Sequence, residues 1–373
     1  MNDTFIHNED IHWYDSEIKT KVKELLDLAK QNLNKEKNFN SNVIIIPHAG
    51  IDYSGYCVAS VLQNYLNNFK MKKKRSKNKK KRSKNRIKYN NKFNQIVILS
   101  THHNNQNKLI FPSGNIHKGN YRNIKIPEFK IYNFVKNNNN CEINNEYFKN
   151  EHSHKNVIPF IEYCFPNISI LPILVGELNN FEEIGNNLFK EFKNTLWIFN
   201  TDLLHVNGHH SFKLNKKNIN IKINELESEI MEPILERKKL SDFVNVIKKD
   251  HTICGLSVLK LFLCIPFVNL IGKVSCYYQS NQIDYIKKNV LNKQDKKDSV
   301  VSYLGCYFVK KNNNELDNLL TKFEELELIE YSKSVLNNKF NKNKIYKPFK
   351  SPSFKFKKGV FVTLKNNNNL RGC

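Results

Sequence analysis

Two short runs of consecutive apolar residues, Val43–Ile46 and Ile96–Leu99, constrain the fold of this chain more than any other feature. A strand that faces water on one side alternates apolar and polar residues, whereas a strand buried on both faces is apolar throughout. Runs this short are typical of strands rather than helices when turn residues bound them. The first run ends at Pro47, which cannot donate a hydrogen bond to a strand ladder. We therefore predict two buried strands of the type found in parallel sheets.

Strands alternate with helices along most of the chain. Apolar segments of strand length recur at 43–46, 95–99, 168–175, 196–199, 272–278 and 300–309. Segments of helical character lie at 17–33, 57–69, 181–193, 221–237, 240–249 and 256–264. This alternation predicts an α/β fold with a mixed or largely parallel central sheet that is flanked by helices.

Histidine and cysteine motifs stand beside the apolar segments. Pro47-His48-Ala49-Gly50 and Thr101-His102-His103 follow the two runs, and Thr252-Ile253-Cys254-Gly255 precedes an apolar helix. Ligands bind beyond the carboxyl ends of the strands in open α/β sheets, so two imidazoles there and one thiolate predict a metal site. These donors suit iron, copper or zinc better than magnesium or calcium. Each residue alone has a simpler explanation, because a histidine can bond to a neighbouring turn and a buried cysteine can pack as a small apolar side chain.

The net charge of +25 is concentrated in one segment. Residues 70–92 hold fourteen Lys or Arg residues and no acidic residue, which leaves +11 on the rest of the chain. We predict that residues 70–94 form a disordered surface insertion, because this composition cannot bury enough apolar surface to become ordered. The alternative is binding to nucleic acid or anionic lipid through charge. A nucleic-acid partner is disfavoured, since only Tyr89 is available for base stacking.

The cysteines and the first residues bear on the cellular location. The eight cysteines show no framework spacing, and residues 1–30 lack the apolar core of a secretion signal. Free thiols fit a reducing compartment. We expect a cytoplasmic protein, with the nucleus as the alternative if the basic segment acts as an import signal. The most apolar stretch, 253–271, is interrupted by Lys260 and Pro266, so no membrane span is expected.

A series of short motifs in sequence order resembles the Memo family, whose fold is similar to that of the class III extradiol dioxygenases. The resemblance covers roughly residues 10–310, and we expect residues 1–310 to form one Memo-like α/β domain. Its motifs are His12-Trp13-Tyr14, Pro47-His48-Ala49-Gly50, Tyr53-Ser54-Gly55, Thr101-His102-His103, Glu151-His152-Ser153, Ile170-Leu171-Pro172-Ile173-Leu174-Val175-Gly176, Asn200-Thr201-Asp202-Leu203-Leu204-His205, Thr252-Ile253-Cys254-Gly255, Tyr278-Gln279-Ser280 and Ser299-Val300-Val301-Ser302-Tyr303.

The resemblance implies a set of site residues. The implied metal ligands are His48, His102 and Cys254. The implied catalytic residues of the same pocket are His152, Asp202 and His205. A histidine beside a metal can orient water or move protons, and Asp202 could hold an imidazole tautomer. The simpler alternatives are a helix cap for Asp202 and solvent exposure for His152. The chain departs from the family pattern at Lys155 and Val157, where a Glu and a His are usual.

The resemblance also implies a cofactor and two functions. The expected cofactor is an iron or copper ion, with zinc as the third candidate. The comparable dioxygenases use two histidines and a carboxylate, so the softer thiolate of Cys254 argues against catechol cleavage. We predict a metal-binding protein with a redox or metal-handling role and with dioxygen or peroxide as small-molecule partners; enzyme status stays open. The alternative is a non-catalytic adaptor for signalling or the cytoskeleton that binds a peptide or protein partner in a dioxygenase-like pocket.

The C-terminal residues differ in character. Residues 315–336 have a helical pattern, and Gly359-Val360-Phe361-Val362-Thr363-Leu364 with Leu370-Arg371-Gly372-Cys373 looks like the opening of an AMMECR-family domain. We expect residues 311–373 to comprise a linker and an incomplete N-terminal part of such a domain.

Overall fold

The structure is a computed structural model, and part of the chain is described. The described residues are 17–31, 42–70, 93–104, 106–114, 116–118, 123–208, 211–215, 217–248, 251–282, 299–311, 320–341, 350–355, 363–366 and 369–372, with the single residues 345 and 348. The basic insertion expected at 70–94 falls almost wholly outside them, because residues 71–92 are not among them.

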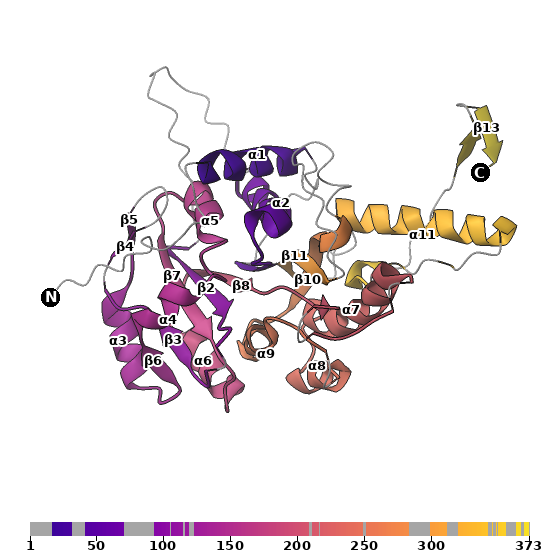
Figure 1. Cartoon of the computed structure of the whole chain (residues 1–373). Helices are drawn as coiled ribbons and strands as arrows, with labels where there is room; N and C mark the ends of the chain where they lie inside the picture. The colour runs from indigo at the N-terminus through magenta and orange to yellow at the C-terminus, as the bar shows by residue number, and fades with distance from the viewer. Residues whose placement is uncertain are drawn as a thin grey trace, which may run out of the picture.

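A central sheet runs through the molecule and holds nine strands within the described residues (Figure 1). In spatial order the strands are β10 (Leu270–Gln279), β11 (Val300–Lys310), β1 (Val43–Ile46), β8 (Thr195–Asn200), β2 (Gln95–Thr101), β7 (Ser169–Val175), β3 (Leu109–Phe111) and β6 (Cys141–Ile143), and β9 (His205–Val206) pairs with β11. Strands β1, β8, β2 and β7 are parallel to one another, while β11 pairs with β1 and β3 pairs with β7 in the antiparallel sense. The predicted α/β fold with a mixed sheet is confirmed.

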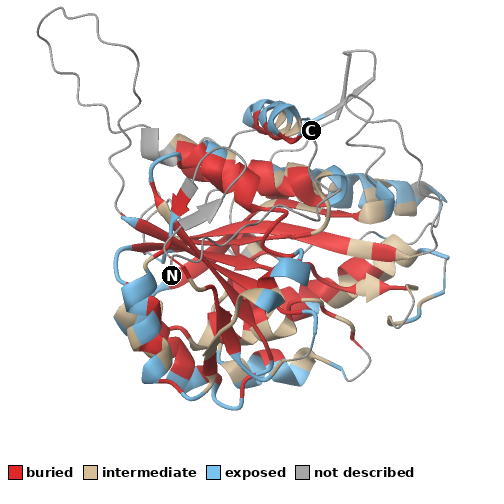
Figure 2. Ribbon diagram, turned by 60° about the vertical axis from the view of Figure 1, so that its left-hand side comes forward, coloured by how far each residue is buried: buried red, intermediate tan, exposed pale blue. Residues whose placement is uncertain are grey.

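Helices cover both faces of the sheet, and its strands are buried between them (Figure 2). One face carries α1 (Ile18–Lys30), α2 (Ile51–Lys70) and α5 (Ile158–Cys164). The opposite face carries α3 (Glu128–Lys136), α6 (Phe181–Glu191), α7 (Ile219–Leu235), α8 (Leu240–Val246) and α9 (Leu256–Cys264). Ile44 and Ile46 pack on the first face, and Val43 and Ile45 pack on the second. Successive side chains of a strand point to opposite faces, so a strand covered on both sides must be apolar at every position.

The helix α11 (Lys322–Asn341) starts against the edge strand β10. The Thr321 hydroxyl donates to the carbonyl of Val274 at 2.5 Å, and the Thr321 N–H donates to the Glu324 carboxylate at 2.8 Å. Beyond this first turn most of α11 is exposed and extends away from the sheet (Figure 1).

The chain returns to β10 after α11. The short helix η3 (Pro352–Lys355) brings Ser353 to the fully buried Lys273, whose Nζ donates to the Ser353 hydroxyl at 2.9 Å. The first turn of α11 and η3 therefore pack against the α/β body, in a region where the sequence predicts a linker. Farther on, β12 (Leu364–Asn366) and β13 (Asn369–Gly372) pair with each other as a two-stranded antiparallel sheet.

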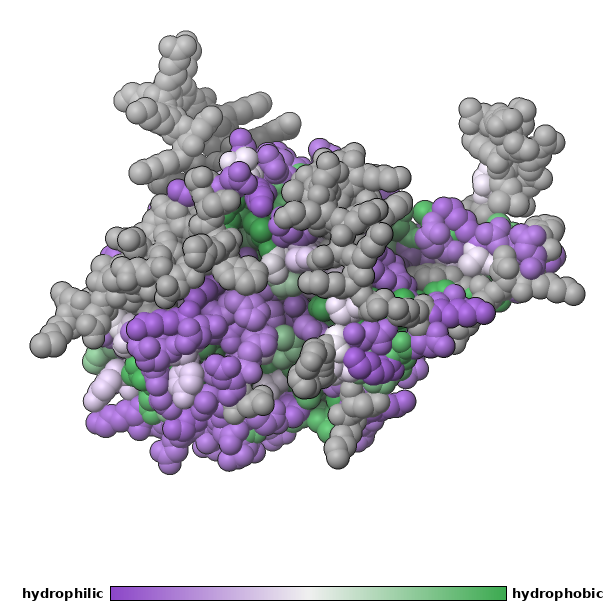
Figure 3. All heavy atoms as spheres, viewed as in Figure 1, coloured by the Kyte–Doolittle hydropathy of each residue, from purple (hydrophilic) through white to green (hydrophobic). Residues whose placement is uncertain are grey.

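Hydrophilic residues dominate the described part of the face shown in Figure 3, and the apolar residues on it are scattered. Among the described helices, none combines the length and the apolar character needed to cross a membrane.

Candidate metal centre

The site is built at the edge of the sheet where four parallel strands end. Ile46 at the end of β1 and Ser100 near the end of β2 both pair with Asn200 at the end of β8. The residues that follow these strands therefore emerge side by side. His48 comes from β1 and His103 comes from β2. The topology predicted from the apolar runs is thus the reason that histidines far apart in sequence can meet.

Three donor atoms converge at this edge. Nε2 of His48 lies 3.2 Å from Sγ of Cys254, and Nε2 of His103 lies 2.9 Å from the same sulfur. The two imidazole rings are 5.3 Å apart between centroids and are edge-on to each other. Two donors bound to one zinc-like ion, with bonds of about 2.1 and 2.3 Å at a tetrahedral angle, would be about 3.6 Å apart. Each Nε2–Sγ distance would therefore have to increase by less than one ångström for the two atoms to share an ion.

The other ring nitrogen of each imidazole fixes its tautomer. Nδ1 of His48 lies 3.2 Å from the carbonyl oxygen of Asn200, and Nδ1 of His103 lies 2.8 Å from Oε1 of Glu151. A carbonyl or carboxylate oxygen only accepts, so each Nδ1 must carry the proton and donate it. Each Nε2 then presents its lone pair toward Cys254, which is the form that a metal requires.

Cys254 reaches the site through a tightly packed turn. Leu204, next to β9, forms an isolated bridge with Ile253, and α9 starts two residues after Cys254. A Cβ atom on Gly255 would lie 2.1 Å from the hydroxyl oxygen of Thr201, so only glycine fits against this residue. Burial raises the pKa of Cys254 well above its usual value, and the negative charges of Asp202 and Glu151 raise it further. Without a cation the group is therefore a neutral thiol.

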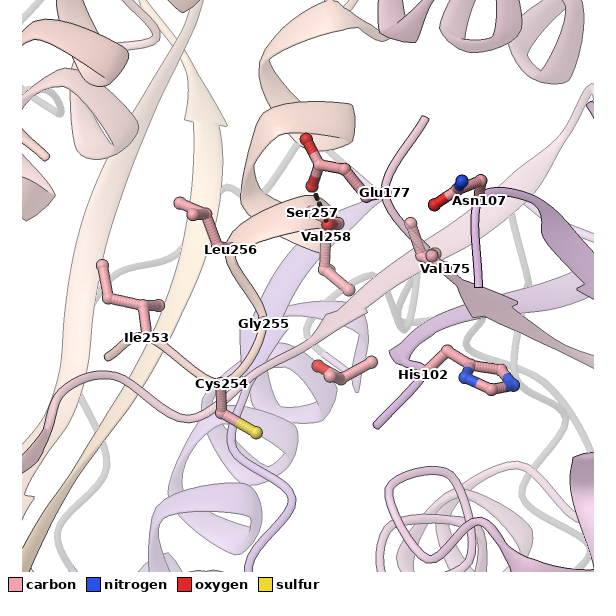
Figure 4. Close-up of a pocket in the computed structure, with 12 residues that line it drawn as sticks. His102, Asn107, Val175, Glu177, Ile253, Cys254, Gly255, Leu256, Ser257 and Val258 are labelled. Atoms are coloured by element: carbon pink, nitrogen blue, oxygen red, sulfur yellow. Dashed lines mark hydrogen bonds between the residues drawn. The ribbon is translucent and has the colours of Figure 1, made fainter. Parts of the chain in front are cut away.

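His102 lies elsewhere. Its Nδ1 accepts the Asn104 N–H at 3.1 Å, and its ring packs edge-on against Tyr147 of α4 (Asn145–Asn150) at 5.0 Å between centroids. In Figure 4 the His102 ring extends away from Cys254. The structure thus places His103 at the position that the sequence analysis gave to His102. The reason is the turn after β2, which sends neighbouring side chains in different directions.

His152 stacks on His103. Their ring centroids are 4.5 Å apart with 19° between the planes, and the ring centroids of His152 and His48 are 6.0 Å apart. One nitrogen from each of His48, His103 and His152 lies within 4.8 Å of the others, so these three residues form a group that could hold a metal ion. Burial and the neighbouring His103 lower the pKa of His152 to about 4, which favours a neutral ring at pH 7.

Asp202 supports the loop that carries His48. Its Oδ1 accepts the backbone N–H groups of His48 at 2.8 Å and Ala49 at 3.3 Å, and its Oδ2 is 3.8 Å from Nε2 of His48. Burial raises the pKa of Asp202. The carboxylate therefore places the His48 backbone at the sheet edge and adds negative charge beside the three donors.

His205 lies on β9, three residues after Asp202. Its Nε2 is buried without a hydrogen-bond partner among the described residues. Burial is the main reason that the pKa of His205 is lowered. His48 and His103 lower it as well, and the Asp202 carboxylate opposes them. His205 therefore interacts electrostatically with residues of the cluster. All three residues expected in the pocket lie around the cluster, at differing depths.

A pocket of about 270 Å³ opens on one side of Cys254 (Figure 4). Its walls are the ends of β2 and β7, the residue Asn107 and the first turn of α9. At its rim the Glu177 carboxylate accepts the Ser257 hydroxyl at 2.7 Å and Lys260 Nζ at 2.6 Å. The pocket is large enough for a side chain or a small molecule to lie against the turn that carries Cys254.

Two residues of the candidate site were not assigned a role from sequence. His103 was passed over in favour of its neighbour, and Glu151 was quoted within a motif without a role. The signal that could have found them is chemical: an acidic residue before a histidine, Glu151-His152, is a suitable partner for a ligand imidazole.

The sequence model of one protein family, described as Memo-like protein, matches residues 71–307, which is more than half of the chain. No curated protein matches the chain in sequence. The crystal structure of the uncharacterized protein JW3007 from Escherichia coli K12 aligns with 57% of this chain and 86% of that chain, at 8% identity and a TM-score of 0.33. That similarity is too low to carry an argument. The family match ends at residue 307, so the AMMECR resemblance beyond it stays a prediction.

Proposed function

The chain belongs to the Memo-like family, and on this premise we propose that it is a metal-binding protein whose ligands are His48, His103 and Cys254. His103 takes the place that the sequence analysis gave to His102. The observation that carries the proposal is the convergence of two Nε2 atoms on one sulfur, at 3.2 and 2.9 Å, with both Nδ1 atoms engaged elsewhere.

The donor set favours iron or copper, with zinc as the third candidate. Imidazole suits iron, copper and zinc, and a thiolate adds preference for soft or borderline ions. Three protein donors leave coordination positions free, and His152 stands beside them as a fourth candidate donor. A bound iron or copper ion would supply one-electron chemistry, which supports a redox or metal-handling role with dioxygen or peroxide as the small partner.

The surrounding residues would manage protons and water in this function. His152 has a half-exposed side chain, so it can exchange protons with solvent. His205 is more buried and holds an unpartnered Nε2 among the described residues, so it can bond to a small molecule in the site. Asp202 holds the His48 loop in place. Catechol cleavage is not expected, because the resemblance puts the softer Cys254 thiolate where the dioxygenases have a carboxylate.

Metal analysis of the purified protein tests the proposal. Protein purified without added metal should contain iron, copper or zinc, and Cys254→Ser should lose most of it. The matched control is Cys264→Ser at the end of α9, a partly exposed cysteine that is not among the donors. Equal and very low metal content in wild type and Cys254→Ser, after exposure to each ion, would refute the proposal.

The pocket beside Cys254 favours a second candidate function, the binding of a peptide side chain. A peptide that fills this pocket would contact the first turn of α9, which the metal donors do not use. Leu256→Trp should then abolish peptide binding and leave the metal content unchanged. The adaptor hypothesis fails if no peptide from a diverse library binds the wild-type protein at micromolar concentration.

A further inference from the structure

The carboxylate of Glu151 is the most heavily bonded acidic group of the site. Oε1 lies 2.8 Å from Nδ1 of His103 and accepts the backbone N–H groups of His152 and Ser153, each at 2.9 Å. Oε2 accepts the backbone N–H of His103 at 2.9 Å. The residue is almost fully buried. Three of these four donors belong to the backbone, so the carboxylate serves mainly to order the two segments that carry His103 and His152.

We propose that Glu151 is the positioning residue that makes His103, rather than His102, the donor from β2. This inference rests on the proposed metal site, and it assigns no contact between Glu151 and the ion. Glu151 accepts hydrogen bonds from both the backbone and the ring of His103, so this residue is fixed at two points. The His102 ring is held differently, because its Nδ1 accepts from Asn104 and the ring packs on Tyr147.

The bond to Nδ1 also fixes the proton. An ionised carboxylate can only accept, so it stabilises the tautomer with the proton on Nδ1 and the lone pair on Nε2. Glu151 accepts from four N–H donors, three of them backbone groups, and this pattern is that of an ionised carboxylate, which only accepts. In metalloproteins such a partner orients the ligand and increases its basicity.

The same carboxylate joins two histidines into one unit. It bonds to the backbone of His152, whose ring stacks on His103 at 4.5 Å. Release of Glu151 would free both rings together. Glu151, which is 48 positions from His103 in sequence, thus orders the histidine that follows β2.

The first test needs no metal. Nitrogen-15 NMR of the metal-free protein, with labelled histidine, reports which ring nitrogen of His103 is protonated. We expect the proton on Nδ1 in the wild type and a loss of this preference in Glu151→Ala. Glu151→Gln should keep the preference, because its amide oxygen can still accept from Nδ1. A wild-type His103 that is protonated on Nε2 would overturn the inference, even if Glu151→Ala failed to fold.

Metal titration forms the second test. Affinity should fall by about 10- to 100-fold in Glu151→Ala, with a smaller loss in Glu151→Gln. The control is Glu227→Gln, because Glu227 is also a buried carboxylate that accepts a backbone N–H, from Leu204 at 2.9 Å, yet bonds to none of the donors. Unchanged affinity in Glu151→Ala, with metal bound to the wild type, would overturn this inference alone. Absence of metal binding in the wild type would overturn the proposed function, while the tautomer measurement would still stand.

Discussion

Nε2 of His103 lies 2.9 Å from Sγ of Cys254, although 151 positions separate the two residues in sequence. His103 follows the central parallel strand β2, and Cys254 stands just before α9, the helix that packs on β2 and β8. Neither residue would approach the other without the turn that carries it. The turn after β2 and the glycine turn before α9 bring them together, so both turns should be sensitive to small substitutions.

Gly255→Ala is expected to disturb the site directly. The added Cβ would lie 2.1 Å from the Thr201 hydroxyl oxygen and 2.8 Å from that of Thr101, so the Cys254 turn must move. Such overpacking typically costs about 1–3 kcal/mol of the free energy of unfolding. We expect that loss in chemical denaturation, with weaker metal binding. Gly50→Ala is the matched control, because its Cβ would meet only Tyr53 at an ordinary 3.6 Å. Equal effects of the two substitutions would contradict this account.

Glu227 should make stability depend on pH. Its carboxylate is fully buried and bonds to the Leu204 N–H and the Tyr277 hydroxyl, and burial raises its pKa to about 7. The unfolded chain releases this proton near pH 4.5, whereas the folded protein keeps it until about pH 7. The folded state is therefore favoured below pH 4.5, and this contribution of about 3 kcal/mol is lost as the pH rises to 7.

Glu227→Gln should remove that pH dependence. The amide stays neutral and can still accept from Leu204, so the free energy of unfolding should vary less between pH 4.5 and 7 than in the wild type. Glu229→Gln, an exposed position on the same helix, should keep the wild-type profile. Superimposable profiles for wild type and Glu227→Gln, measured by urea denaturation, would refute the assignment.

Arg237 should stabilise the end of α9. Its guanidinium donates to the carbonyl oxygens of Phe262, Ile265 and Phe267, and it stacks over the Phe262 ring at 4.5 Å. Arg237→Ala removes these three bonds, and although the Ile265 carbonyl keeps the Phe267 N–H as a donor, we expect a loss of about 2–4 kcal/mol in the free energy of unfolding. Arg237→Lys should recover part of it. Metal content per folded protein should not change, because Arg237 bonds to none of the site residues; a selective loss of metal would show that this view is incomplete.

The strands that carry the site could be predicted from sequence, because they are covered on both faces and so consist of apolar residues. The run at 43–46 coincides with β1, and the run at 95–99 falls within β2. The strands β3 and β6 gave no such signal, because each has only three residues. The direction of β11 against β1 was also beyond reach, since orientation depends on pairing between residues far apart in sequence.

The sequence pointed to the region of the candidate site, but not to which of two adjacent histidines faces Cys254. His48 and Cys254 stand at positions that the chain marks by small neighbours, Ala49-Gly50 and Gly255. The choice between His102 and His103 depends on Glu151, whose contact with the turn exists only in the folded protein. A local pattern cannot report which of two adjacent side chains a distant carboxylate will hold.

The metal content of His103→Ala beside that of His102→Ala tests the central claim most directly. Both substitutions remove one imidazole from the same turn, so general effects on the turn are matched. We predict that His103→Ala loses nearly all bound iron, copper or zinc, measured by elemental analysis on folded protein, while His102→Ala keeps a wild-type amount. Retention of metal by His103→Ala and its loss from His102→Ala would contradict the assignment of the site.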